Sequence, residues 1–264
     1  MKPDCILIRI GEMSLKSEQV NRKWSKILMD NIKYGLKGFD YKIEKRKNRY
    51  FIYTNNIDKV SKILQRIFGI TSISLCYVCK SNINNIKKKA LEVAKNKIKK
   101  SQAFAISVKR IDFQDLSSQE IAIKVGDIIV NKLGLKVNLS NPDKTIFIEA
   151  RNDKTYIYME KINCAGGLPL GTSGKIGAIV NSKKALVATW LMMKRGCTII
   201  FKGKQEFFDI LKKWHIGKRM LKTEKFKNIK ISTGKKINDS VFLDPTVAFS
   251  RDKLTRLYEY IVNN

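Results

Sequence analysis

Apolar residues in the first eighty positions alternate in some stretches and recur at helical spacing in others. Alternation at Ile6, Ile8 and Ile10 predicts a strand, because successive strand side chains face opposite sides. The predicted elements are, in order, strand 6–10, helix 20–32, strands 41–45 and 50–54, helix 60–67 and strand 70–79. Gly69 suits the end of the second helix. This order predicts a ferredoxin-like domain over residues 1–80.

The next stretch, residues 81–165, has the pattern of a second α+β domain. Ser117 and Glu120 have the spacing of a capping box, which marks the start of a helix. The predicted elements are helix 86–98, strand 104–108, helix 121–133 and strands 145–150 and 155–160. The last two strands are separated by residues 151–154, which predict a hairpin.

Residues 166–174 contain four glycines and one proline, residue types that are typical of turns and loops. This segment is predicted to be a flexible interdomain linker. Beyond it, the predicted elements are strand 175–180, helix 182–195, strand 197–201, helix 205–214 and a terminal helix 252–262. Strands that alternate with helices predict a small α/β domain over 175–264. The whole chain is therefore predicted to be an α+β protein in three parts.

The net charge of the chain indicates what kind of partner it binds. The chain has 53 Lys and Arg residues against 23 Asp and Glu, a formal charge of +30 and a pI near 10.0. A folded chain with this excess indicates a polyanionic partner, most often nucleic acid. The polar face of helix 86–98 and the residues after it are almost all lysine: Lys87, Lys88, Lys89, Lys95, Lys97, Lys99 and Lys100. The alternative is a general lysine bias in composition.

The cysteines and the hydropathy pattern bear on localisation and metal binding. An odd number of cysteines, five, and the lack of a secretory leader predict a reducing, cytoplasmic environment, and no apolar run is long enough for a membrane. Cys76 and Cys79 are three apart in a predicted strand, so they are expected on opposite faces. No metal site is predicted.

No catalytic residue is predicted either. His215 is the only histidine and lies among lysines, which favours a surface contact or a role at a helix C-terminus over a catalytic triad. Gly171–Lys175 lacks the spacing of a Walker A loop, since Pro169 stands at the first glycine position and Ile176 follows the lysine.

Several motifs, in matching order and spacing, give the chain to about residue 196 a resemblance to a known family. They are Gly11-Glu12, Leu15-Lys16, Asn21-Arg22, Val108-Lys109-Arg110, Ser118-Gln119-Glu120, Leu139–Asp143, Tyr158–Lys161, Gly166–Lys175 and Leu191–Gly196. The middle unit resembles the THUMP domain, an RNA-binding module. The chain resembles the tRNA 4-thiouridine synthetases, the ThiI-like tRNA sulfurtransferases, over about three quarters of its length.

The resemblance implies that the ferredoxin-like and THUMP domains together hold the acceptor end of tRNA. The residues expected to contact RNA are Lys16, Asn21, Arg22, Lys87, Lys88, Lys109, Arg110, Gln119, Lys136, Arg151 and Lys161. Lysines suit phosphate contacts, whereas the planar guanidinium groups of Arg22, Arg110 and Arg151 suit an RNA end.

The resemblance also implies a following PP-loop domain, in which a Ser-Gly-Gly-x-Asp-Ser loop holds the pyrophosphate of ATP. Glycines are needed there because a side chain would occupy the place of the phosphate. The matching positions of this chain are Val180, Asn181, Ser182, Lys183, Lys184 and Ala185. Two lysines could attract a phosphate, but both glycines are replaced. We therefore expect a truncated, Rossmann-like PP-loop domain without a cofactor.

These patterns together predict a tRNA-binding THUMP protein that is non-catalytic or accessory to a separate tRNA-modifying subunit, and that could also pair with itself as a homodimer. No membrane partner is expected. Two alternatives stay open: an active 4-thiouridine synthetase that uses ATP, and a general RNA- or ribosome-binding protein that needs only the charge.

Overall fold

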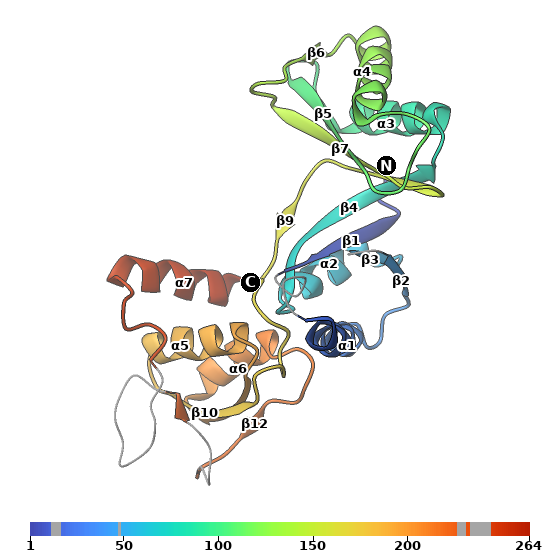
Figure 1. The fold of residues 1–264 in the computed structure, drawn as a ribbon. Coiled ribbons are helices and arrows are strands. Elements are labelled where there is room, and N and C mark those ends of the chain that lie inside the picture. The colour runs from blue at the N-terminus through green and yellow to red at the C-terminus, as the bar shows by residue number, and fades with distance from the viewer. Residues whose placement is uncertain (12–16, 47–48, 226–230, 233–243) are drawn as a thin grey trace. The chain divides into compact units, whose positions relative to one another are not determined.

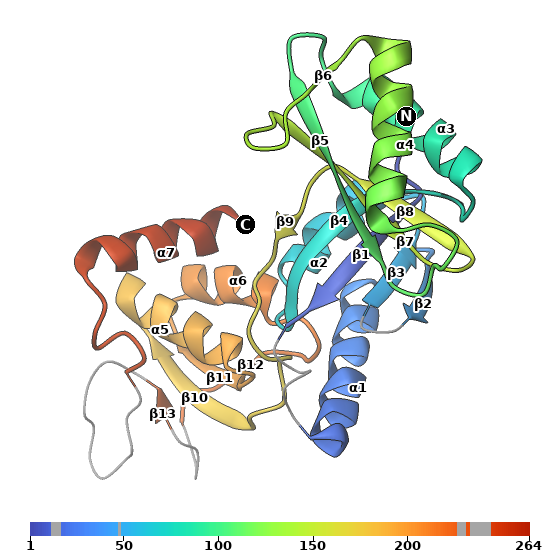
Figure 2. The ribbon, with the colours of Figure 1, turned by 45° about the horizontal axis from the view of Figure 1, so that its top comes forward.

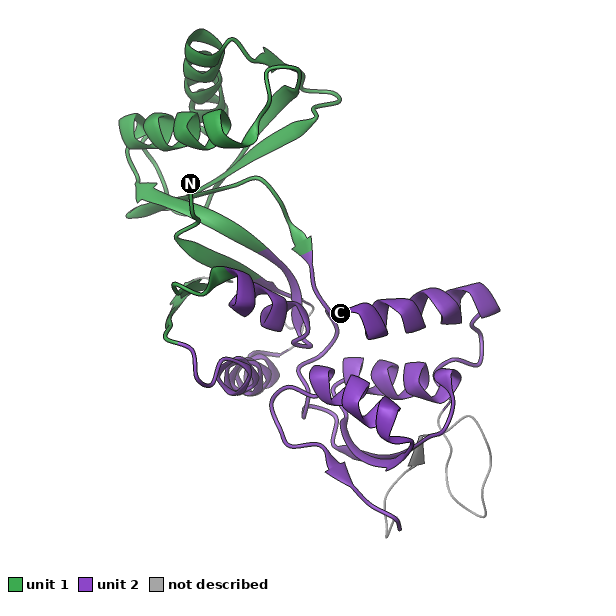
Figure 3. Cartoon of the chain, turned by 180° about the vertical axis from the view of Figure 1, so that it is seen from behind, with its two compact units in different colours: residues 1–8, 40–57, 74–162 green, residues 9–39, 58–73, 163–264 purple. Residues whose placement is uncertain are grey.

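The structure, a computed structural model, describes residues 1–11, 17–46, 49–225, 231–232 and 244–264 (Figures 1 and 2). Lys16 lies outside the described residues, as do the central positions of the predicted turn at 46–49. The chain forms two compact units (Figure 3). Unit 1 comprises residues 1–8, 40–57 and 74–162, and unit 2 comprises residues 9–39, 58–73 and 163–264. Both units therefore contain part of the first eighty residues.

The first part of the chain has the predicted ferredoxin-like order of elements. They are β1 (Cys5–Ile10), α1 (Glu18–Gly35), β2 (Lys42–Arg46), β3 (Arg49–Tyr53), α2 (Ile57–Gln65) and β4 (Ile70–Lys80). The strand order is β2-β3-β1-β4, and β3 is antiparallel to both β1 and β2. This arrangement confirms the predicted ferredoxin-like domain.

The second α+β region extends the same sheet. Its elements are α3 (Ile83–Lys97), β5 (Ala103–Arg110), α4 (Ser118–Leu133), β6 (Lys136–Val137), β7 (Lys144–Ala150), β8 (Lys154–Tyr158) and β9 (Ile162–Asn163). The sheet continues from β4 in the order β8-β7-β5-β6. The capping box of Ser117 and Glu120 is present, and Gly134 ends α4 in the left-handed conformation with φ 64°.

Helices α3 and α4 pack against each other and against this part of the sheet, and their apolar faces form a core of unit 1. Buried members from the helices are Ile86, Ala90, Val93, Ile121, Val125 and Ile129. The helical spacing of these residues leaves the opposite faces of both helices, with their charged residues, directed to solvent.

Unit 2 contains a small parallel sheet. Its elements are β10 (Lys175–Val180), α5 (Lys183–Lys194), β11 (Thr198–Gly203), α6 (Gln205–Trp214), β12 (Leu221–Lys222), β13 (Ile231–Ser232) and α7 (Arg251–Asn263). The strand order is β12-β11-β10-β13, with all neighbours parallel. In sequence order the strands are arranged 3-2-1-4, as in the first four strands of a doubly wound sheet, which confirms the predicted α/β class. The short strands β12 and β13 were not predicted.

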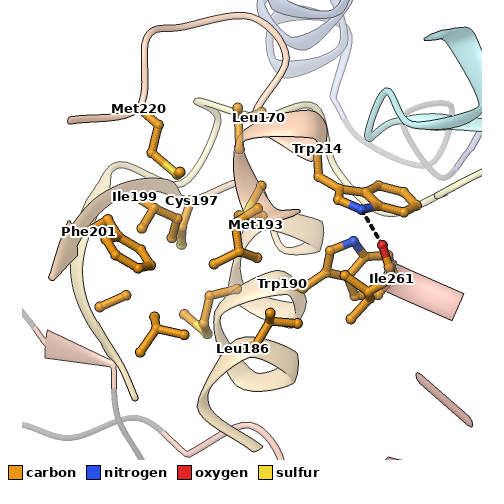
Figure 4. Close-up of a cluster of buried hydrophobic side chains, with 14 of the residues drawn as sticks. Leu170, Leu186, Trp190, Met193, Cys197, Ile199, Phe201, Trp214, Met220 and Ile261 are labelled. Carbon is orange, nitrogen blue, oxygen red and sulfur yellow. Dashed lines mark hydrogen bonds between the residues drawn. The ribbon is translucent and has the colours of Figure 1, made fainter. Parts of the chain in front are cut away.

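The core of unit 2 places α5 between the sheet and α7 (Figure 4). Trp190, Trp214 and Tyr260 form edge-on and tilted ring contacts, with centroids 5.4 to 5.9 Å apart. The indole N–H of Trp214 donates to the carbonyl oxygen of Ile261 at 3.0 Å, which satisfies a buried polar group. Helix α7 is thereby tied to α6 as well as to α5.

The predicted flexible linker at 166–174 is wrong, because this segment is fixed within unit 2. The backbone N–H groups of Leu168 and Gly171 donate to the carbonyls of Lys194 and Gly196, at 2.9 and 2.8 Å. Leu170 is buried in the core. Gly167 has φ +73°, and a Cβ there would overlap the carbonyl of Lys194. The glycines allow close approach to the end of α5 rather than flexibility.

Within the part of the chain that the structure describes, no helix is both long and apolar enough to cross a membrane.

Candidate nucleic-acid interface

The solvent-facing side of α3 and the residues after it carry a set of cations, here called the α3 lysine face. Its members are Lys87, Lys88, Lys95, Lys97, Lys99 and Lys100. All are exposed except Lys87, which is half-buried. Among the described residues, none of the six has a carboxylate partner, whereas the neighbouring Lys89 pairs with Glu92 at 3.0 Å. Unpaired like charges on one face favour a polyanionic ligand.

A second group of predicted contacts lies at the end of β5. Lys109 and Arg110 are both exposed. One guanidinium nitrogen of Arg110 donates to the carbonyls of Phe113 and Leu116, at 3.4 and 3.0 Å. Arg110 therefore holds the loop that leads into α4 while the rest of its guanidinium faces solvent.

The remaining predicted contacts of unit 1 that lie at the surface are Gln119, Lys136 and Lys161. Gln119 is in the first turn of α4, and Lys136 is in β6, which contacts α4. The ammonium of Lys161 lies 4.4 Å from the ring centre of Phe147, which orients its side chain. Since α4 also contacts α3 and β5, unit 1 brings most of the predicted contacts onto adjoining elements.

Arg151 corrects the prediction of an exposed RNA contact, because its side chain is buried. It is 2% exposed, and its Nε and a terminal nitrogen donate to one carboxylate oxygen of Glu149, itself 1% exposed, at 3.0 and 2.8 Å. Arg49 lies 3.6 Å from the other oxygen, and the ring centre of Phe51 is 5.5 Å from the guanidinium. Arg151 balances a buried charge and does not face solvent.

Asn21 and Arg22 are on α1, in unit 2, and so belong to a different compact unit from the α3 lysine face (Figure 3). Arg22 is exposed and forms an ion pair with Glu18, one helical turn earlier. The side-chain oxygen of Asn21 accepts a hydrogen bond from Ser25 at 3.1 Å. Both contacts are local to the helix and leave the two side chains accessible.

The altered PP-loop positions form a two-residue junction between β10 and α5. Ser182 caps α5, since its hydroxyl oxygen accepts from the N–H of Ala185 at 3.2 Å. The ammonium of Lys184 lies 3.1 Å from a carboxylate oxygen of Asp244, and that of Lys183 lies 4.8 Å from the ring centre of Tyr258. Asn181 is exposed. The junction is thus occupied by contacts within the chain, with one first-turn amide already capped.

The two cysteines of the Cys-x-x-Cys sequence face opposite sides of β4, as predicted. Cys76 packs with Cys5 and Phe51, whereas Cys79 packs against the core under α3 and α4. Burial raises the pKa of the Cys79 thiol to about 11, so it is protonated at neutral pH. Among the described residues, no group of three or more potential metal ligands is present.

Two roles were predicted for His215: a surface contact, which is wrong because its ring is buried, and a role at a helix C-terminus, which agrees with its position as the C-cap of α6. The ring Nε2 accepts the N–H of Ile199 in β11 at 3.0 Å, so Nδ1 carries the proton and donates to the carbonyl of Lys218 at 2.9 Å. Burial lowers the pKa of this imidazole, and the neutral form holds the turn after α6 against the sheet.

Acidification is therefore expected to destabilise the protein through His215. In the unfolded chain the histidine binds a proton near pH 6.5, whereas in the folded protein it binds one only at lower pH. The contribution of His215 to the free energy of unfolding is therefore fully present above pH 6.5. It falls as the pH drops below that value, by at most about 1.4 kcal/mol per pH unit. Melting temperatures between pH 7.5 and about 5.5 would measure this effect. His215→Gln, which keeps an acceptor but does not titrate, should give a flatter curve; parallel curves would contradict the assignment.

Family models place these features in a known class. The THUMP domain model matches residues 80–160, and the ThiI ferredoxin-like domain model matches residues 5–74. The chain is therefore a THUMP-domain protein with an N-terminal ferredoxin-like domain. Its relatives include a probable tRNA sulfurtransferase of Methanobrevibacter smithii, 36% identical over 76% of this chain, and one of Thermococcus kodakarensis, 33% identical over 80%. The chain belongs to this ThiI-like, tRNA sulfurtransferase-like family.

The match to these relatives is partial. The chain spans 53% of the M. smithii protein and 61% of the T. kodakarensis protein. Among solved structures, PH1313 from Pyrococcus horikoshii matches 98% of this chain and 99% of its own, with a TM-score of 0.84 and 29% identity. A 4-thiouridine synthetase solved with RNA and ATP matches 82% of this chain and 60% of its own, with a TM-score of 0.71 and 24% identity, which shows a shared fold.

Sequence reasoning missed one basic feature, a pocket of about 810 Å³ in unit 2. Its charged residues are Arg66, directly after α2, and residues of α6, the turn after it and β12, which lie far from Arg66 in the sequence. No local motif marks them, and only the sequence 212–219, rich in lysine and arginine, gave a signal.

Proposed function

We propose that this chain binds tRNA at the acceptor end and does not itself modify it. The observation that carries the binding proposal is the α3 lysine face together with Lys109 and Arg110, all on the THUMP domain and without carboxylate partners among the described residues. Phosphate contacts from such cations give affinity, and the shape of the RNA gives selectivity. A homologous fold has been solved with RNA bound, which supports the choice of ligand.

The proposal that the chain is non-catalytic rests on the β10–α5 junction. A phosphate cradle at a helix N-terminus needs free amides and glycines that let the backbone wrap around the anion. Here Asn181 and Ser182 stand at the glycine positions, and Ser182 already accepts the amide of Ala185. We propose that chemistry on the bound RNA is carried out by a separate modifying subunit.

The alternative, an active 4-thiouridine synthetase, is favoured by the names of the relatives and by the two lysines at the start of α5. Exchange of labelled pyrophosphate into ATP, with and without tRNA, separates the two functions. We expect no exchange above background from a preparation that binds tRNA, with an active 4-thiouridine synthetase as the positive control. Exchange that tRNA stimulates would establish the alternative.

Arg110→Ala is expected to weaken tRNA binding by about 1–3 kcal/mol, because it removes a charge-assisted contact. Since Arg110 also holds the loop at Phe113 and Leu116, Arg110→Lys is the matched control: it keeps the charge and loses most of the loop contacts. Fluorescence anisotropy with labelled tRNA measures both variants. Lysine should restore part of the affinity if the charge contacts RNA, and unchanged affinity of the alanine variant at low and moderate salt would exclude Arg110 from the interface.

A further inference from the structure

The basic pocket of unit 2 lies between the last turn of α1, the end of α2, α6 and residues 215–222, and has a volume of about 810 Å³. Six cationic side chains line it, against the single carboxylate of Asp209: Arg66, Lys212, Lys213, Lys218, Arg219 and Lys222. The turn carrying two of these cations has no place in the family motifs described above. All lining residues belong to unit 2, so the pocket is a feature of one compact unit.

The cations of this pocket are not neutralised by the protein. Lys222 donates to the side-chain oxygen of Gln205, and its ammonium lies 5.3 Å from the ring centre of Phe208. Within the described part of the chain, the other five have no carboxylate partner, and Asp209 accepts only from Gln205, at 2.8 Å. Like charges around a concave surface repel each other, and a bound anion relieves that repulsion.

The helix dipole explains only some of these charges. Lys212 and Lys213 are in the last turn of α6, where cations stabilise the helix. Arg66 directly follows the end of α2, where the dipole also favours a cation. Lys218, Arg219 and Lys222 lie four or more residues beyond α6, so the dipole does not account for them.

Arg66 is the cation with the strongest need for a ligand. Its side chain is half-buried, and its Nε is buried without a hydrogen-bond partner among the described residues. Burial lowers the pKa of this guanidinium. A buried N–H of a guanidinium without an acceptor costs free energy, and a phosphate that accepts two parallel hydrogen bonds from the group offsets that cost.

The turn that carries Lys218 and Arg219 is held in place before any ligand arrives. The His215 ring connects this turn to β11, because it accepts the N–H of Ile199 and donates to the carbonyl of Lys218 within the turn. Gly217, with φ +125°, packs so closely on Asn31 that a Cβ would overlap the Asn31 side chain, which is itself held by the carbonyl of Leu170 at 3.0 Å. A preformed turn lowers the entropy lost when a ligand binds.

Aromatic and apolar side chains complete the pocket and indicate the kind of phosphate ligand. Tyr34 is 50% exposed and Leu221 is 51% exposed, and the ring of Phe208 is half-buried beside them. Cations combined with an exposed aromatic ring are typical of sites for single-stranded nucleic acid, where bases stack on the ring. A concave pocket of this volume suits one or two nucleotides and not a duplex.

We propose that this pocket binds a single-stranded segment of RNA, with Arg66, Lys212 and Arg219 on the phosphates and the ring of Tyr34 against a base. The proposal rests on the proposed function, because it requires that the chain bind RNA. It adds a contact in unit 2 to those expected on the THUMP domain in unit 1.

The test compares two triple variants of the full chain that lose the same charge. The pocket variant is Arg66→Met with Lys212→Gln and Arg219→Gln, and the control on α7 is Arg251→Gln with Lys253→Gln and Arg256→Gln, all exposed positions. Anisotropy with a fluorescent oligouridine measures affinity, with inorganic tripolyphosphate and ATP as competitors and intact tRNA as a parallel ligand. Melting curves show whether each variant is folded. If Arg66→Met prevents folding, the double variant Lys212→Gln with Arg219→Gln replaces the triple variant.

We expect the pocket variant to lose about tenfold or more in oligouridine affinity and the control about twofold or less. Tyr34→Ala should also weaken binding, by about fivefold or more, through loss of stacking. Equal losses of oligouridine affinity in both triple variants would overturn the proposal that this pocket binds RNA, but would not contradict the proposal that the chain binds tRNA. Tighter binding of tripolyphosphate or ATP than of oligouridine, with no effect of Tyr34→Ala, would overturn RNA as the ligand. Failure of the unmodified chain to bind tRNA would instead overturn the proposed function.

Discussion

Arg151→Met is expected to lower the free energy of unfolding by about 3–5 kcal/mol, the range found when one partner of a buried ion pair is removed. Methionine keeps much of the volume beside Phe51 but removes the closer of the two cations from the carboxylate of Glu149, which is 1% exposed, and leaves Arg49 at 3.6 Å. Chemical denaturation followed by circular dichroism measures this loss. It should be the largest effect of any single substitution at a residue predicted from the sequence to bind RNA.

The matched control removes the charge as well as its partner. Glu149→Gln combined with Arg151→Met removes both members of the fully buried pair and leaves the Arg49 guanidinium, whose side chain is 17% exposed, as the charge beside them. The double variant should therefore regain part of the stability lost by Arg151→Met alone. Folded Arg151→Met protein, assayed at low temperature, should bind tRNA nearly as well as the unmodified chain. A variant as stable as the unmodified chain that has lost tRNA affinity would restore Arg151 to the RNA-binding surface.

The elements of the fold could be predicted from the sequence because their signals are local. The spacing of Ile86, Ala90 and Val93 reflects burial of one side of a helix. The apolar residues at the start of β1 predicted a strand correctly, although Cys5 to Ile8 are buried on both faces and not on one. The capping box at Ser117 likewise depends on residues three apart. Two-residue strands such as β12 are too short to produce a pattern, so they were missed.

The errors arise where distant segments meet. Arg151 follows β7 at the start of a predicted hairpin, only two residues from its partner Glu149. The residues that enclose this pair, Arg49 and Phe51, come from the distant strand β3 and leave no local signal. His215 stands among lysines, yet the backbone of β11 supplies its donor. The glycine-rich segment 166–174 suggests flexibility, whereas the end of α5 and residues 69–70 fix its backbone. The exposed lysines were easier to predict, because a charged helix face has the same periodicity as its buried side.

Binding of tRNA is expected to weaken steeply as salt rises, because the proposed interface consists mainly of cations at the surface. Each phosphate that a lysine or arginine neutralises adds about −0.7 to −0.9 to the slope of log affinity against log salt. Four such contacts, fewer than the exposed members of the α3 lysine face, correspond to a slope of about −3 to −4 and to about 10²-fold between 50 and 200 mM salt. A slope near zero would mean that these cations do not contact phosphate.

The salt dependence would also be seen with any RNA, so recognition of the acceptor end needs a comparison between matched ligands. The most direct measurement titrates the full chain with intact tRNA, with the same tRNA lacking its terminal CCA, and with a duplex RNA of equal length, all at about 150 mM salt. We expect the intact tRNA to bind about tenfold or more tightly than either of the others, since unpaired ends offer bases and a free 3′ terminus that a duplex lacks. Equal affinity for all three RNAs would contradict acceptor-end recognition and would identify the chain as a general RNA-binding protein.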